Sequence, residues 1–198
     1  MSELIDVIPI GSRIPRRGGR LSQRIFAAVL GLMGWRITGS IPDEPKMVMI
    51  AGPHTSNWDF VMGVLCLFTL GLKVRWIGKH TIFVGPFGTW LRHFGGIPVN
   101  RSSPGALFRD VLNGFKENEA FIFGLSPEGT RSKVAEWKPG FHRIARAAGV
   151  PLLLVGVDFG RKTMHFGPLY EVSDDFEADV SALKVHYNSF TAKHPELF

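Results

Sequence analysis

The chain has 198 residues, 45% hydrophobic and 20% charged, so we expect one folded domain with a buried core rather than a disordered chain. Its formal net charge of +6 favours an anionic partner, which nucleic acid, a phosphorylated small molecule or an anionic bilayer would satisfy. Its one cysteine, Cys66, stands in an apolar run and cannot form an internal disulfide, which predicts a buried packing residue in a cytoplasmic protein.

The first 45 residues are expected to form a basic arm and an amphipathic helix. Five arginines precede the apolar run IFAAVLGLMG at 25–34: Arg13, Arg16, Arg17, Arg20 and Arg24. Trp35, a residue type favoured at membrane interfaces, follows the run. The run is shorter than the roughly 20 apolar residues that span a bilayer, and the residues before it are a poor secretory signal. Two interpretations stay open: the helix binds an anionic membrane surface, on the inner face of the cell membrane, or it packs on the domain.

From residue 46 onwards, predicted strands alternate with predicted helices. The strands are predicted at 46–52, 73–79, 96–100, 120–126, 151–159 and 163–167. The helices are predicted at 55–72, at 86–94, from Pro104, at 141–148 and at 176–187. This alternation is typical of a single-domain α/β sandwich with a largely parallel sheet flanked by helices. We expect residues 46–170 to form the α/β core and 171–198 a C-terminal helix that Asp174 and Glu177 cap.

The motif HTSNWD places His54 and Asp59 five residues apart, a spacing at which a regular helix would point them away from each other. The three residues between His54 and Trp58 all have N-cap chemistry, so a helix is expected to begin there. His54 then lies on the turn and Asp59 in the first helical turn, where contact is feasible. A histidine oriented by an aspartate can act as a general base. The simpler alternative is that Asp59 only stabilises the helix dipole.

Two further motifs, GGIPVNR and SPEGTRS, each place an arginine directly after a predicted strand. The guanidinium groups of Arg101 and Arg131 suit bidentate binding of a phosphate or carboxylate, and Gly129 lets backbone amides approach an anion. Ligands of α/β sheets bind at the carboxyl ends of strands, so the three motifs together predict one site. The local alternatives are a surface arginine and an ordinary turn.

The ordered set HTSNWD, GGIPVNR, SPEGTRS and VPLLLVGVDF resembles the four sequence blocks of the glycerol-phosphate and lysophospholipid acyltransferase family, which includes the 1-acylglycerol-3-phosphate acyltransferases. It covers about residues 46 to 160. The resemblance implies that the core transfers a fatty acyl group from acyl-CoA or an acyl-carrier protein, with no cofactor, to the hydroxyl of a lysophospholipid or related glycerol-phosphate acceptor. It implies that His54 is the base and Asp59 its orienting partner. It also implies five acceptor-binding residues: Arg101, Glu128, Gly129, Thr130 and Arg131.

Three features depart from the family pattern. Ser126 stands where members usually carry an aromatic residue, so we expect a different acceptor pocket. The chain is short for the family. Arg161 and Lys162, after the last block, resemble a compact bacterial branch.

In the expected reaction, neutral His54 takes the acceptor proton as the acceptor oxygen attacks the thioester carbonyl. Backbone amides of the turn 54–59 are candidate donors to the resulting oxyanion. No metal is expected, because no other histidine has ligand spacing with His54 and Asp59. No nucleic acid is expected either, because the basic arm lacks interleaved aromatic residues. Two other functions stay open: a protein that binds a lipid or acyl carrier without turnover, and a hydrolase of acyl thioesters or lipids.

Overall fold

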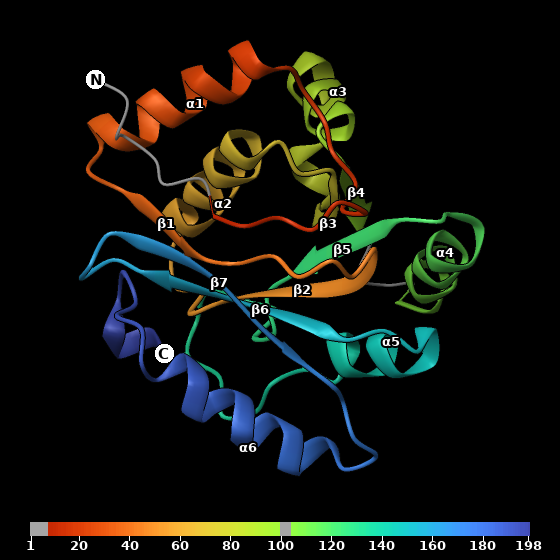
Figure 1. The fold of residues 1–198 in the computed structure, drawn as a ribbon. Coiled ribbons are helices and arrows are strands. Elements are labelled where there is room, and N and C mark those ends of the chain that lie inside the picture. The colour runs from red at the N-terminus through yellow and green to blue at the C-terminus, as the bar shows by residue number, and fades with distance from the viewer. Residues whose placement is uncertain (1–7, 100–103) are drawn as a thin grey trace.

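A computed structural model describes residues 8–99 and 104–198, which form a mostly parallel seven-stranded sheet with helices on both faces (Figure 1). The strand order is β1-β7-β6-β2-β5-β3-β4. The pairing of β6 with β7 is antiparallel, and the other five pairings are parallel. The predicted α/β fold with a largely parallel sheet is therefore confirmed.

All of the predicted strands and helices are present. The strands are β1 Arg36–Gly39, β2 Lys46–Gly52, β3 Val74–Lys79, β4 Gly96–Val99, β5 Phe121–Leu125, β6 Leu152–Asp158 and β7 Thr163–Tyr170. The helices are α1 Arg20–Leu32, α2 Asn57–Leu70, α3 Gly85–His93, α4 Pro104–Glu117, α5 Gly140–Ala148 and α6 Phe176–Tyr187, with short 3-10 turns at His80–Ile82 and Pro195–Leu197. Strand β1 was not predicted, because its four residues bury only one side chain and it is defined by backbone pairing with β7.

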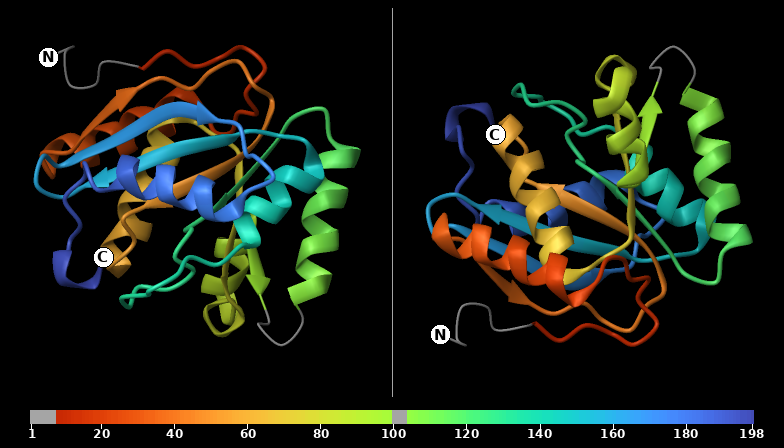
Figure 2. Two further views of the ribbon diagram at one scale, coloured as in Figure 1. Left: turned by 90° about the horizontal axis from the view of Figure 1, so that it is seen from below. Right: turned by 90° about the horizontal axis from the view of Figure 1, so that it is seen from above.

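Two hydrophobic clusters lie on opposite faces of the sheet. Successive strand residues point to opposite faces, so Met49 of β2 packs towards α2, while Ile50 packs towards α5 and α6. From above, α1, α2 and α3 cover the near face, and from below α5 and α6 cover the other (Figure 2). Cys66 lies in the first cluster, and burial raises the pKa of its thiol, which confirms the predicted packing residue.

Helix α1 packs on the domain with one face. The ring of Phe26 stacks on Phe68 of α2 with the centroids 4.6 Å apart, and Leu30 is fully buried. Trp35 is buried too, with its ring edge-on to Phe159. The expectation that Trp35 is available to a membrane is therefore wrong, because this side chain is part of the core.

The residues before α1 are bound to the same domain rather than extended from it. The backbone amide of Arg17 donates to the carbonyl of Gly71, and its guanidinium donates to the carbonyl of His93. Arg13 pairs with Asp43, with Nε and Oδ2 3.1 Å apart. Four of the five arginines nevertheless remain exposed, namely Arg13, Arg16, Arg20 and Arg24, and Arg17 is half-buried.

The C-terminal helix α6 begins one residue away from the predicted cap. Asp175 is the N-cap residue, and its side chain accepts a hydrogen bond from the amide of Ala178. Asp174 instead pairs with Arg146 of α5. At the other end of α6, the buried Tyr187 donates to the carbonyl of Ile50, which ties the helix to the central strand β2.

Candidate active site

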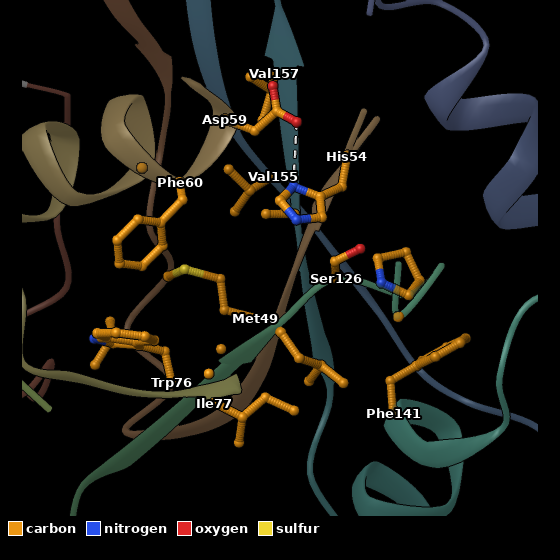
Figure 3. Close-up of a pocket in the computed structure, with 18 of the residues that line it drawn as sticks. Met49, His54, Asp59, Phe60, Trp76, Ile77, Ser126, Phe141, Val155 and Val157 are labelled. Carbon is orange, nitrogen blue, oxygen red and sulfur yellow. Dashed lines mark ion pairs between the residues drawn. The ribbon is translucent and has the colours of Figure 1, made fainter. Parts of the chain in front are cut away.

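The predicted contact between His54 and Asp59 is present at the carboxyl end of β2. The chain turns at Gly52 and Pro53, and Ser56 then caps α2 by accepting a hydrogen bond from the amide of Trp58. This turn brings His54 Nδ1 to 3.2 Å from Asp59 Oδ2. The second ring nitrogen, Nε2, is turned away from Asp59 towards the interior of a cavity (Figure 3). His54 is thus oriented as a general base needs to be.

The carboxylate of Asp59 is fixed by the turn that it caps. Its Oδ2 accepts hydrogen bonds from the amides of Thr55 and Ser56, each at 2.7 Å, and the side chain is only 3% exposed. Among residues 8–99 and 104–198, its Oδ1 finds no hydrogen-bond partner. Asp59 therefore cannot move without breaking the start of α2, and this holds His54 in place.

The backbone amides of this turn are already engaged. The amides of Thr55 and Ser56 donate to Asp59, that of Trp58 donates to Ser56 Oγ, and that of His54 donates to Glu128. The expectation that amides of this turn bind the oxyanion is therefore wrong for these four, because each already donates within the protein.

Glu128 lies behind the histidine rather than open to a ligand. Its Oε1 accepts a hydrogen bond of 3.0 Å from the His54 amide, and its Oε2 accepts one from the Ser126 hydroxyl. Burial raises the pKa of the Glu128 carboxyl, although both hydrogen bonds act in the opposite direction. The resemblance placed Glu128 at the acceptor, whereas the contacts that it makes are with the backbone of the base. Ser126, the departure from the family pattern, helps to hold it there.

A cavity of about 740 Å³ opens beside His54. Its interior is apolar, lined by side chains of α2 and of the neighbouring strands: Met49, Phe60, Val64, Leu67, Trp76 and Val155 (Figure 3). Another part of its lining is polar and cationic: Lys79, Ser126, Thr130, Arg131 and Lys138. Such a cavity can take a molecule with an apolar chain and an anionic group, next to a base.

The structure brings most of the predicted site residues together around this cavity. His54, Asp59, Gly129, Thr130 and Arg131 all line it. Arg101 lies outside the described residues. Among the residues described, no group of three or more His, Cys, Asp or Glu side chains could hold a metal ion.

Sequence reasoning missed two lysines of the lining, Lys79 and Lys138. Lys79 is the last residue of β3, so the rule that ligands bind at the carboxyl ends of strands could have identified it. Lys138 has no such pattern. A Cβ added at Gly129 would lie 3.1 Å from the Lys138 Cδ, so the lysine stem runs close to this glycine.

Comparisons with known proteins agree with this geometry. A family model described as Acyltransferase matches residues 36–158. The chain is 25% identical over 177 residues to the 1-acyl-sn-glycerol-3-phosphate acyltransferase of Streptococcus pneumoniae, an alignment that covers 79% of this chain and 66% of that protein. It is 30% identical over 107 residues to the chloroplastic 1-acyl-sn-glycerol-3-phosphate acyltransferase BAT2 of Brassica napus, covering 50% of this chain and 30% of that protein. The chain therefore spans just under two thirds of the length of the first relative and less than a third of the second.

The fold also matches a solved structure. The crystal structure of the 1-acyl-sn-glycerophosphate acyltransferase PlsC from Thermotoga maritima superposes with a TM-score of 0.60 at 19% identity, over 86% of this chain and 76% of that one. At this identity the match bears on the fold alone. The family model, in contrast, spans more than half of the sequence and includes both His54 and Asp59. On these grounds, the chain belongs to the acyltransferase family.

Proposed function

We propose that the protein transfers a fatty acyl group from a thioester to the hydroxyl of a lysophospholipid or related glycerol-phosphate acceptor. The observation that carries the proposal is the His54–Asp59 pair beside a large apolar cavity whose lining also includes cationic side chains. The apolar part suits an acyl chain, and Arg131 suits the phosphate of the acceptor. The relatives named above carry out, by their names, acylation of 1-acyl-sn-glycerol-3-phosphate.

In the proposed mechanism, His54 Nε2 removes the proton from the acceptor hydroxyl as the oxygen attacks the thioester carbonyl. Asp59 stabilises the imidazolium that forms, because its Oδ2 faces Nδ1. The tetrahedral intermediate then collapses, the carbon–sulfur bond breaks, and the imidazolium returns a proton to the leaving thiolate. The histidine thus transfers one proton from the acceptor hydroxyl to the leaving thiolate. The products are an ester and a free thiol of coenzyme A or of an acyl-carrier protein.

The direct test is mass spectrometry of the products that purified protein forms from a labelled acyl thioester and a panel of lysolipids. An acylated lysophosphatidate, formed in equal amount to the free thiol, supports the proposal. Release of free fatty acid without acylation of any acceptor would identify a hydrolase. Binding of the thioester with no product at all would identify a binding protein.

Arg131 offers a test of the acceptor site. We expect Arg131→Lys to keep the charge but lose the bidentate fork, so that the KM for the acceptor rises about tenfold while the KM for the thioester changes little. Steady-state kinetics with each substrate varied in turn measures both values. The matched control is Arg36→Lys on β1, an exposed arginine at the far edge of the sheet. A rise confined to the thioester KM would place Arg131 on the donor instead.

We infer that the protein works at the surface of an anionic membrane, where its acceptor resides. Helix α1 supports this, because Leu21 is 73% and Leu32 is 89% exposed beside the exposed Arg20 and Arg24. None of the helices in the described ranges is long and apolar enough to cross a membrane.

We expect the full-length protein to sediment with anionic vesicles at low salt and to be released as salt is raised. Leu21→Ser together with Leu32→Ser should weaken sedimentation without unfolding the protein, since both side chains face solvent. Deleting residues 1–35 is not a clean test, because it would remove the buried Leu30 and Trp35 from the core. If the protein failed to sediment even at low salt, α1 would be a purely structural helix.

A further inference from the structure

The segment that leads into α3 exposes an unusual amount of apolar surface. Ile82, Val84, Phe87 and Trp90 are 39%, 68%, 60% and 46% exposed. Phe87 and Trp90 are three residues apart in α3 and are therefore neighbours on the helix surface, whereas Gly88 and Leu91 of the same helix are buried and Val84 precedes its first turn. The rings of Phe87 and Trp90 stack on each other with their centroids 5.8 Å apart. We call these four side chains the α3 apolar face.

The charged residues that neighbour this face in the sequence all have one sign. No Asp or Glu occurs between Asp59 and Asp110, whereas Lys79, His80, Arg92 and His93 flank the face. The sequence around α1 also lacks acidic residues, from 7 to 42, and Asp43, which follows, pairs with Arg13. Helix α6, on the opposite side of the sheet, is acidic at its start. Exposed aromatic side chains with cations and no anions are typical of contact with an anionic lipid surface.

The α3 apolar face belongs to the same side of the molecule as α1. Both helices lie on the side of the sheet that α2 covers (Figure 1). The Arg17 guanidinium, just before α1, donates to the carbonyl of His93 at the end of α3, with Nη2 and O 2.7 Å apart. A series of ring contacts joins the two helices: Phe26 with Phe68, Phe68 with Phe94, and Phe94 with Trp90. One planar partner could therefore contact both helices.

The face also adjoins the cavity. Lys79, which lines the cavity, ends β3 and directly precedes the turn His80–Ile82. Ile77 and Gly78, on the same strand, line the cavity as well. A partner seated on the α3 apolar face would therefore lie beside the cavity that contains His54.

We propose that the α3 apolar face is a second membrane-binding element, which inserts Phe87 and Trp90 into an anionic bilayer and holds the cavity next to it. The proposal rests on the proposed function in one respect, namely that the acceptor is a lipid in that bilayer. The acceptor would then enter the cavity from the membrane without crossing water, and binding through α1 alone would not orient the cavity in this way.

The experiment compares Phe87→Ser/Trp90→Ser with the control Val185→Ser, which removes an apolar side chain that is 74% exposed from α6 on the opposite side of the sheet. The probe is sedimentation with phosphatidylglycerol-containing vesicles. We expect the double variant to partition at least about tenfold more weakly, because two apolar side chains lose their burial in lipid, and the control to partition like the wild type. Acylation of a long-chain acceptor held in vesicles should fall with binding, while acylation of a short-chain, monomeric acceptor should not.

Two further readouts cover the cases in which the double variant misfolds or the reaction is a different one. Brominated lipids should quench the tryptophan fluorescence of the wild type, and the milder Trp90→Phe should lose part of that quenching. Vesicle binding needs no turnover, so it tests the α3 apolar face even if no acyl transfer is found. Unchanged partitioning of a folded double variant would overturn the proposal. So would equal loss of activity on the monomeric acceptor, or a wild-type dimer that the double variant converts to a monomer, since the face would then serve the active site or a second copy.

Discussion

His54→Ala is expected to lower the rate of acyl transfer by about 10²- to 10⁴-fold, the range that general-base catalysis contributes. The imidazole is the group whose Nε2 faces the cavity, whereas the Asp59 carboxylate in the same turn is buried and already accepts two backbone hydrogen bonds. The fold should survive, because His54 is partly exposed and Asp59 keeps its two backbone donors when the ring is removed. Turnover measured on the purified variant, together with its thermal unfolding midpoint, checks both statements.

Asp59→Asn is the matched partner of that variant, and its loss of activity should be large but smaller. The amide oxygen can still accept from Thr55 and Ser56, but a neutral side chain cannot stabilise the imidazolium. The amide NH₂ would occupy the buried position where Oδ1 has no partner, so the free energy of unfolding should fall by about 1–3 kcal/mol. Near wild-type turnover in a folded His54→Ala protein would end the dyad hypothesis, whatever Asp59→Asn does.

Glu128→Ala is expected to lower kcat by about a hundredfold with little change in the KM for the acceptor. The carboxylate accepts a hydrogen bond from the His54 amide, so its removal leaves that amide without a partner and lets the histidine shift. A displacement of a catalytic group by about 1 Å can lower the rate about a hundredfold. Glu128→Gln should restore most of the activity. Its amide oxygen can accept from His54, and its NH₂ can donate to Ser126 once that hydroxyl rotates.

The pair of variants separates a positioning role from acceptor binding. If Glu128 bound the acceptor, both substitutions would chiefly raise the acceptor KM, and Gln would not restore kcat. Stability gives a second readout. Because the pKa of Glu128 is raised in the folded protein, its protonated form stabilises the fold below the ordinary value of about 4.3, and this contribution is lost as pH rises through the higher, folded pKa. In denaturant unfolding, the free energy of unfolding of Glu128→Gln should therefore increase relative to that of the wild type as pH rises across that window.

The sequence by itself determined the fold class and the contact between His54 and Asp59. Several strands are short apolar runs with a glycine or proline at or just after their end, and several helices have a cap or an apolar stripe, so every element except β1 could be assigned from neighbouring residues. The dyad was predictable for the same reason. His54 and Asp59 are joined by a six-residue turn whose N-cap residue begins a helix, and local backbone geometry alone brings them to 3.2 Å. Gly129, Thr130 and Arg131 could be placed at the same edge, because the strands before the motifs are parallel.

Only the tertiary structure decided how the pair is supported and which surfaces are free. Glu128 accepts a hydrogen bond from the amide of His54, which is 74 residues away in the chain. No local sequence pattern shows which distant group a carboxylate will contact. The sequence shows which side chains are apolar and how they are spaced, but it does not show whether another element covers them. Trp35 is therefore buried where exposure was expected, and Phe87 and Trp90 are exposed although they resemble core residues. Burial is a property of the packed molecule, since it depends on elements that are distant in the chain and become neighbours only when the sheet forms.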